Sequence, residues 1–315
     1  MSLPRLALFI LSLTIAAVAG AVQRVEQECF PLAPGGTVKL DAYRGAINVV
    51  AGEGDRVMVL VNLGLPAEAS AAARQVLDGF ALTGVTKNGV LTLTARNPLD
   101  RTTRFAWDRD PRPEITYTVE VPEHVQLELQ TGDGSITVGN LQGRMQARAR
   151  QGTIFFRQID GSVDARTEKG DVVVSRCTGA VTLRTVQGSI RIGTIGGRAS
   201  LETVDGDIEF QAAHAPVVAV TRSGDITAGF AAVAGGSQVR TALGNITAQV
   251  NPDAAFALRA QSGWGPVEAK LPFENEGNGR SGRLSGLRNG GGPLLELSAG
   301  GGRVTIAPDD TFLPL

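Results

Sequence analysis

Aromatic side chains, histidine and cysteine are all scarce in this 315-residue chain. Aromatic residues make up 5% of it, and it holds two histidines and two cysteines beside 40 glycines. Few large side chains and many turn-forming residues favour thin, repetitive β-structure over a thick globular core. Two cysteines cannot form the disulfide framework that holds many small secreted domains together.

An excess of charge of either sign is also missing. The chain has 30 basic and 31 acidic residues, so its formal net charge is −1. Nucleic acid and acidic membrane surfaces attract proteins through a large positive charge, which this chain does not have. We therefore expect no nucleic-acid partner.

Long apolar runs are confined to the N-terminus. Arg5 is followed by the apolar run 6–19, and Ala19-Gly20-Ala21 has the small-x-small pattern of a cleavage site. We predict a signal peptide over residues 1–21, and the alternative is an uncleaved anchor helix. No later segment is long and apolar enough to span a bilayer, so we expect no transmembrane span after cleavage. The predicted protein is exported, either to the periplasm or to the extracellular side at the cell surface.

A repeat of 18 residues dominates the middle of the chain. Each unit has a glycine, then a small or polar residue, then isoleucine or valine, and the first four units have a second glycine nine positions after the first. The first glycines lie at Gly134, Gly152, Gly170, Gly188, Gly206 and Gly224, and Gly244 follows after 20 residues. A fixed period of this kind is the signature of a solenoid.

Alternation within each unit predicts which side chains point inward. Residues two apart on a strand share a face, so Ile190 and Ile192 point one way and Arg191 points the other way. The glycines suit corners, where the backbone needs unusual dihedral angles or a close approach. The predicted fold is all-β: a single-stranded parallel β-helix, or β-solenoid, with coils of about 18 residues, plus one short N-terminal helix.

Threonine occupies one position of most repeats, on the side opposite the arginines. An internal threonine ladder can hydrogen-bond along the stack, whereas an ice-binding array would need its threonines on the outer face. We expect the inward ladder for Thr131, Thr167, Thr185, Thr203, Thr221 and Thr241. The repeat also makes Cys177 a small core residue. The alternative, a disulfide between Cys29 and Cys177, stays open.

The repeat predicts one continuous solenoid with irregular ends. Its pattern recurs near Gly45 and near Gly302. The predicted parts are the signal peptide 1–21, an irregular capping region 22–122, the regular solenoid 123–272, and a Gly-rich loop with a closing coil over 273–315. A helix is predicted at 66–78, where Pro66 suits the first turn and Gly79 the C-terminal end. Further strands are predicted at 80–93 and 115–121, with a charged loop at 101–112 between them.

The iterated segments TGDGSITVGNLQG, TEKGDVVVSRCTG and TVQGSIRIGTIGG, with the closing LLELSAGGGRVTI, resemble a bacterial putative-adhesin family of unknown function. The resemblance covers residues 30–306. It implies an exported or envelope-associated β-helix protein, and it brings no catalytic motif. Some members are encoded beside envelope-stress regulators.

The residues themselves give little support to an enzyme, a cofactor or a metal. His124 and His214 lie in no metal-ligand spacing, and neither a nucleophile elbow nor a phosphate-binding loop is present. The hexapeptide rule of solenoid acyltransferases fails, because Gly196 stands six positions after Ile190. Three aspartates follow repeat glycines, and two readings stay open for them. Asp207 and Asp225, adjacent in the stack, could bind Ca²⁺ together with Asp205, or all three could be ordinary corner residues: Asp171, Asp207 and Asp225.

The most distinctive outward feature is a column of arginines in one register of the repeat, with Glu202 and Val220 interposed. They form a candidate stripe for anionic glycan, phosphate or lipid headgroups: Arg148, Arg166, Arg184 and Arg240. The alternative is a solvated face with local Glu and Asp pairing. We expect a non-catalytic envelope protein with an adhesin-like surface, whose partner is envelope polysaccharide or another envelope protein. The alternatives are an accessory of envelope-stress signalling and a carbohydrate-active enzyme.

Overall fold

The computed structural model of the chain describes residues 10–12, 22–66, 68–96, 113–274 and 282–309. Nearly all of the regular structure in these residues is β-strand, in long sheets that are mostly parallel, as a β-solenoid requires. The chain divides into two compact units, residues 1–142 and residues 143–315. The predicted loop at 101–112 lies outside the described residues.

The described residues of the unit 1–142 form strands of two sheets and one helix. The strands of one sheet lie in the order β1 (Ile10–Ser12), β2 (Val22–Pro31), β5 (Arg56–Leu65), β8 (Glu114–Pro122), β4 (Ala46–Gly52), β10 (Ile136–Val138). The other has the order β9 (Gln126–Asp133), β3 (Thr37–Ala42), β7 (Val90–Arg96), β6 (Ala81–Lys87). The short strand β11 (Leu141–Gln142) ends the unit. Strand β1 lies inside the predicted signal peptide and pairs antiparallel with β2.

Strands β3 and β4 form the first coil along the chain, but they are not the outermost coil of their unit. Strand β3 pairs parallel with both β7 and β9, and β4 pairs parallel with both β8 and β10. The coil formed by β3 and β4 therefore lies between two coils that follow it in sequence. Beyond it, β5 and β6 run antiparallel to their neighbours and end the regular stack.

Helix α1 covers Ala71–Asp78, inside the range predicted from the sequence but starting five residues after Pro66. The later start follows from Ser70, whose Oγ accepts a hydrogen bond from the backbone N–H of Ala73 and so caps the helix. Ala73 and Leu77 are fully buried, which fixes the inner face of the helix.

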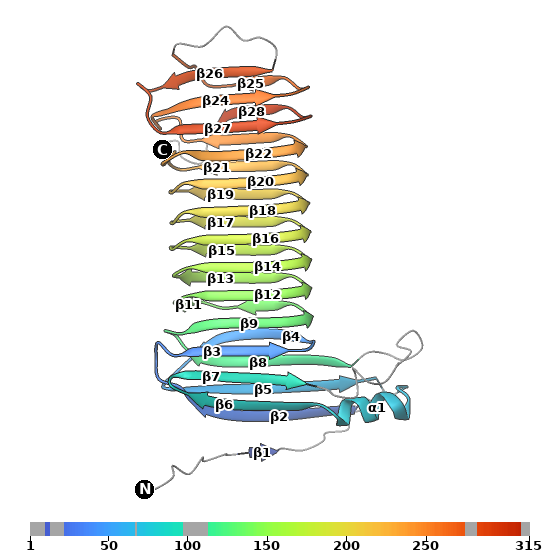
Figure 1. The fold of residues 1–315 in the computed structure, drawn as a ribbon. Helices are drawn as coiled ribbons and strands as arrows, with labels where there is room; N and C mark the ends of the chain where they lie inside the picture. Colours follow the sequence, from blue (N-terminus) through green and yellow to red (C-terminus); the bar gives the residue numbers. More distant parts are fainter. Residues whose placement is uncertain (1–9, 13–21, 67, 97–112, 275–281, 310–315) are drawn as a thin grey trace. The chain divides into compact units, whose positions relative to one another are not determined.

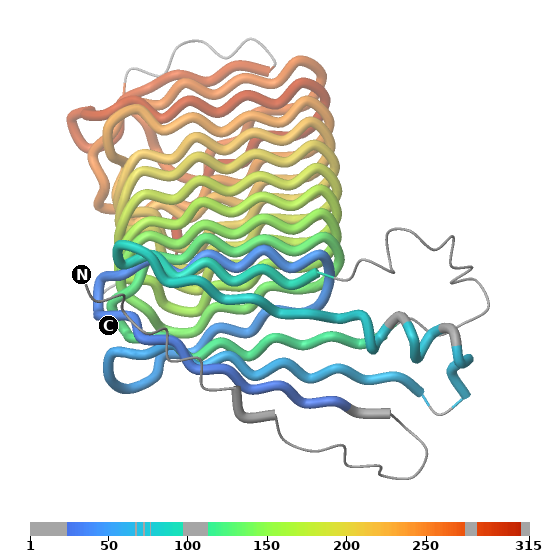
Figure 2. Tube along the Cα trace, turned by 60° about the horizontal axis from the view of Figure 1, so that its bottom comes forward, coloured from blue at the N-terminus to red at the C-terminus, as the bar shows by residue number. Residues whose placement is uncertain are grey.

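The unit of residues 143–315 is built from two long sheets. Sheet A has the order β13 (Ile154–Asp160), β15 (Val172–Cys177), β17 (Ile190–Ile195), β19 (Ile208–Ala213), β21 (Ile226–Phe230), β23 (Ile246–Val250), β28 (Val304–Pro308), β25 (Val267–Ala269). Sheet B has the order β12 (Met145–Gln151), β14 (Val163–Lys169), β16 (Val181–Gln187), β18 (Ala199–Asp205), β20 (Val217–Ser223), β22 (Ser237–Leu243), β27 (Leu294–Ala299), β24 (Phe256–Ser262), β26 (Arg283–Arg288). Each coil gives one strand to each sheet, and the coils stack one above another in Figures 1 and 2.

The register of these strands follows the sequence repeat. Residues that pair across neighbouring strands from β12 to β20 are 18 positions apart, as in Met145 with Val163 and Val172 with Ile190. The inward assignments are confirmed by burial of the residue two after each repeat glycine: Ile154, Val172, Ile190, Ile208, Ile226 and Ile246. Each coil thus adds one layer to a continuous apolar column.

The last coil of the sequence is inserted into the stack. Strand β27 pairs parallel with β22 on one side and β24 on the other, and β28 lies in the same way between β23 and β25. The coil formed by β24 and β25 is therefore farther from β22 than the closing coil is (Figure 1). Strand β26 then pairs antiparallel with β24 at the edge of the sheet. Part of the Gly-rich loop predicted within 273–315 is instead the strand β26, and residues 275–281 lie outside the described residues.

Candidate functional site

The four candidate arginines all lie on the outer face of sheet B, exposed to solvent. Arg148 pairs in register with Arg166, and Arg166 with Arg184, on the successive strands β12, β14 and β16. We call these three residues the arginine row. Arg240 shares their register on β22, but the strands that carry Glu202 and Val220 separate it from them. The structure therefore brings three of the four side chains together.

The arginine row is only partly neutralised by acidic side chains. Arg166 Nε lies 3.4 Å from Asp164 Oδ1 on the same strand, and Arg184 Nε lies 3.2 Å from Glu202 Oε2 on the next one. Arg148 has no acidic partner among the residues that the structure describes. Exposed pairs of this kind are weak, because water screens them. The local pairing expected for a solvated face is thus present for two of the three arginines.

The corner aspartates form a ladder of side-chain to backbone hydrogen bonds. Asp171 Oδ1 accepts from the N–H of Ser189, and Asp207 Oδ1 accepts from the N–H of Asp225, each at 2.8 Å. Asp225 Oδ1 in turn accepts from the N–H of Asn245 at 2.7 Å. Each carboxylate thus satisfies a backbone donor of the next coil, which is the corner chemistry expected of Asp.

The described residues do not support a calcium-binding site at these aspartates. Asp205 is the last residue of β18, and its Oδ1 pairs with Arg222 at 3.0 Å. No group of three or more His, Cys, Asp or Glu in the described chain has the geometry to hold a metal ion. The two histidines, His124 and His214, are exposed.

Both cysteines are free. Cys29 is exposed, while Cys177 is buried and its Sγ donates to the carbonyl oxygen of Gly161 at 3.1 Å. Burial raises the pKa of the Cys177 thiol above its ordinary value. A buried, protonated thiol is a poor nucleophile, so Cys177 is a core residue, as the repeat predicted.

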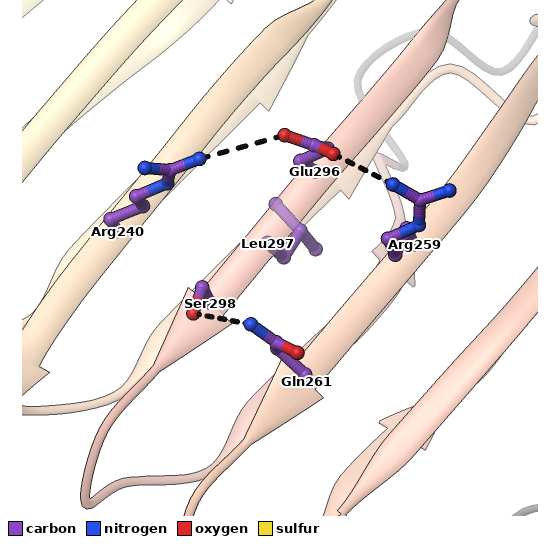
Figure 3. A pocket seen from close by; sticks show the side chains of 6 residues that line it. All are labelled: Arg240, Arg259, Gln261, Glu296, Leu297 and Ser298. Atoms are coloured by element: carbon purple, nitrogen blue, oxygen red, sulfur yellow. Dashed lines mark hydrogen bonds and ion pairs between the residues drawn. The ribbon is translucent and has the colours of Figure 1, made fainter.

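A shallow groove of about 450 Å³ lies on the outer face of sheet B, where β22, β27 and β24 meet. In Figure 3, Glu296 lies between two guanidinium groups, 3.6 Å from Arg240 and 3.1 Å from Arg259. Beside them the amide Nε2 of Gln261 donates to Ser298 Oγ at 3.2 Å. Leu297, which is buried, completes the lining.

Sequence reasoning found Arg240 but missed the other polar residues of this groove. Arg259 and Gln261 come from one coil, whereas Glu296 and Ser298 come from the closing coil inserted beside it. The repeat pattern around Leu297 aligns Ser298 with Arg240, and this was the available signal. The 18-residue period of the sequence does not indicate that β27 lies between β22 and β24.

No helix in the described part of the chain is long and apolar enough to cross a membrane.

In the first unit, Glu26 and Glu28 face the same side of β2 as the buried valines of β5 with which they pair. Burial, together with the charge of Glu26, raises the pKa of Glu28. These carboxylates are far from the arginine row in sequence and belong to the other unit.

Several solved structures are similar to this chain at low sequence identity. One is a putative adhesin from Bacteroides fragilis, 12% identical, with a TM-score of 0.42; the match covers 91% of this chain and 97% of that one. Another is a putative lipid binding protein from Parabacteroides distasonis, 11% identical, with a TM-score of 0.46 and coverage of 89% and 96%. A putative cell adhesion protein from Clostridium sporogenes is 11% identical, with a TM-score of 0.26 and coverage of 91% and 100%.

No curated protein matches the sequence. A family model described as Toastrack DUF4097 matches residues 126–307. This range includes the strands that carry the arginine row, the aspartate ladder and the groove. Because the match extends over more than half of the sequence, this chain belongs to the Toastrack DUF4097 family.

Proposed function

We propose that this chain is an exported, non-catalytic protein of the bacterial cell envelope that binds anionic polymers through the arginine row. The observation that carries the proposal is the register of Arg148, Arg166 and Arg184 on three successive parallel strands. Neighbouring strands lie about 4.8 Å apart, so the row presents forked donors at a regular short spacing. Guanidinium groups bind carboxylate and phosphate in two-pronged fashion.

The charge around the row also favours an anionic ligand. The outward side chains of β12, β14 and β16 include four arginines, the fourth being Arg150, against the two carboxylates of Asp164 and Glu168. The ion pairs that do form are exposed, so an anionic group of a ligand can compete with Asp164 and Glu202. Export rests on the predicted signal peptide of residues 1–21.

The absence of catalysis in the proposal rests on what the described residues offer. A hydrolase or lyase would need clustered carboxylates or a base of perturbed pKa on one face. The corner aspartates are instead engaged with backbone N–H groups. We therefore assign the outer face of sheet B to binding.

The proposal is tested by replacing Arg148, Arg166 and Arg184 together by Ser and measuring retention on an immobilised anionic polysaccharide such as polygalacturonate. A matched control replaces three exposed arginines of sheet A, Arg157, Arg176 and Arg191, by Ser. We expect binding to fall at least tenfold in the first variant and to persist in the control. The chain length of the polysaccharide should stay unchanged after long incubation with the wild-type protein. Equal binding by the two variants, or shortening of the polymer, would overturn the proposal.

A further inference from the structure

The groove lined by Arg240, Arg259 and Glu296 lies close to an unusual aromatic side chain. Trp264 follows the end of β24 and is 91% exposed. It is the only aromatic residue among the large hydrophobic side chains that are exposed in the described chain. A single exposed apolar residue needs no explanation, but Trp264 has an apolar counterpart across a gap.

The backbone places Trp264 level with Gly301. A Cβ on Gly263 would lie 2.4 Å from the carbonyl oxygen of Gly300, and one on Gly265 would lie 2.2 Å from that of Gly302. The residue between the two glycines therefore stacks on Gly301. The same comparison aligns Gly301 with Leu243 on its other side, because Gly300 stacks on Ala242 and Gly302 on Gly244.

Gly301 therefore lies between two apolar residues of the same register, and we call the space over this glycine the slot. Leu243 is 65% exposed, and its Cδ2 would lie 3.8 Å from a Cβ placed on Gly301. Trp264 stands on the opposite side, two strand spacings from Leu243, or about 9.6 Å along the stack. Gly301 has no side chain to fill the space between them.

Polar groups that both donate and accept hydrogen bonds lie on the two strands that lead to the slot. Gln261 lies three residues before Trp264, and its amide is already oriented by Ser298 (Figure 3). Farther along the groove, Glu296 lies between two guanidinium groups and pairs with both. Sites for small polar ligands combine an apolar wall with a few fixed polar groups of this kind.

We propose that the slot and the groove form a binding site for a neutral pyranose within a polysaccharide chain. The apolar face of the sugar ring stacks on Trp264, and its hydroxyl groups exchange hydrogen bonds with Gln261 and Ser298. A neutral sugar leaves the pairing of Glu296 with both arginines intact, whereas an acidic sugar would have to compete with Glu296 for them. This site differs in place and in ligand chemistry from the arginine row, and it does not depend on it.

The test measures binding of soluble neutral tetrasaccharides of glucose, mannose, galactose and N-acetylglucosamine to the full chain by calorimetry. We expect at least one to bind, and Trp264→Ala to weaken that binding at least tenfold while Trp264→Phe retains most of it. Gly301→Leu should weaken it as strongly, because a side chain would fill the slot; this glycine does not have positive φ, and its Cβ would meet no atom closer than 3.7 Å.

Since Trp264 and Gly301 are exposed, all three variants should keep the melting temperature of the wild type. The Ser variant of the arginine row should bind the tetrasaccharide normally, which separates this proposal from the previous one. The proposal is overturned if none of the four sugars binds, or if Trp264→Ala and Gly301→Leu bind as tightly as the wild type.

Discussion

The repeat glycines and threonines act together at each corner of the second unit. Gly170 and Gly188 have φ of +139° and +150°, and a Cβ on Gly188 would lie 2.1 Å from the carbonyl oxygen of Gly170. That same carbonyl accepts a hydrogen bond of 2.9 Å from Thr185 Oγ1. Glycine thus lets the coils approach closely, and the threonine satisfies the carbonyl at the corner.

Replacing Gly188 by Ala tests this arrangement. The new Cβ would require both a strained backbone and a separation of the coils, so we expect the free energy of unfolding to fall by at least about 2 kcal/mol. Chemical denaturation measures the loss. Gly64→Ala is the control, because φ there is not positive and a Cβ would meet no atom within 4 Å. Similar losses of unfolding free energy in both variants would show that the corner has no particular requirement for glycine.

Tyr117 gives a second test at the scale of one residue. It is fully buried, and its hydroxyl has no hydrogen-bond partner among the described residues. Leaving a hydroxyl unsatisfied is unfavourable, so Tyr117→Phe should raise the free energy of unfolding by about 1 kcal/mol. An unchanged or lower stability would indicate that the hydroxyl has a role in the fold.

The pH dependence of the same variant is fixed in sign. Burial, aided by Tyr43, raises the pKa of Tyr117 above its ordinary value of 10.0. The folded chain then keeps this proton where the unfolded chain loses it, so its contribution to stability is intact below pH 10 and is lost as the pH rises further. Tyr117→Phe should flatten this alkaline decline, measured by denaturation between pH 9 and 11.

Several residue roles could be predicted from the sequence, and some partners could not. Alternation alone placed the threonines inward, and the structure confirms this for Thr167, Thr185 and Thr203, all buried. The hydroxyls also bond along the stack as expected, but the partner of each one is a glycine carbonyl of the preceding coil and not the next threonine. The choice depends on the backbone path at the corner, which the period of the sequence does not specify.

At the scale of the element, each coil depends on its neighbours for burial. Ile190 is fully buried and pairs with Val172 on one side and Ile208 on the other. A short strand cannot bury an apolar face alone, so the stack as a whole stabilises each strand. A charge introduced into the column therefore affects several coils.

Ile190→Asp should unfold the second unit or lower its stability by more than about 4 kcal/mol, because an unpaired carboxylate would enter the apolar column. Val186→Asp is the matched control, since Val186 lies on the outer side of the preceding strand and is 46% exposed. We expect the control to keep its melting temperature within a few degrees. Equal behaviour of the two variants would contradict the inward assignment of Ile190.

The order of the coils was the main element-scale feature that the sequence did not reveal. The pattern around Gly45 and Gly302 predicted coils at both ends, and the structure has them as β3–β4 and β27–β28. A repeat specifies how a coil packs but not which neighbour it chooses. Both coils are inserted between two others. The chain passes between the inserted coil and its outer neighbour through antiparallel strands, which are β5 in the first unit and β26 in the second.

At the scale of the whole molecule, the proposed function depends on surfaces that the repeat creates. A repeat of 18 residues places equivalent outward side chains in straight rows, so three arginines of the sequence become one row of charge. The row could be predicted, because it follows the period. The groove and the slot beside Trp264 could not, because they combine residues from coils that are neighbours only after the closing coil is inserted.

The most direct test of the central claim is the salt dependence of polysaccharide binding. Affinity of the wild type for polygalacturonate should fall steadily between about 50 mM and 500 mM salt, as screening weakens charge pairing. The Ser variant of Arg148, Arg166 and Arg184 should bind much more weakly at low salt, and its affinity should meet that of the wild type at high salt. Equal affinities at low salt would contradict the assignment of the arginine row as the binding surface.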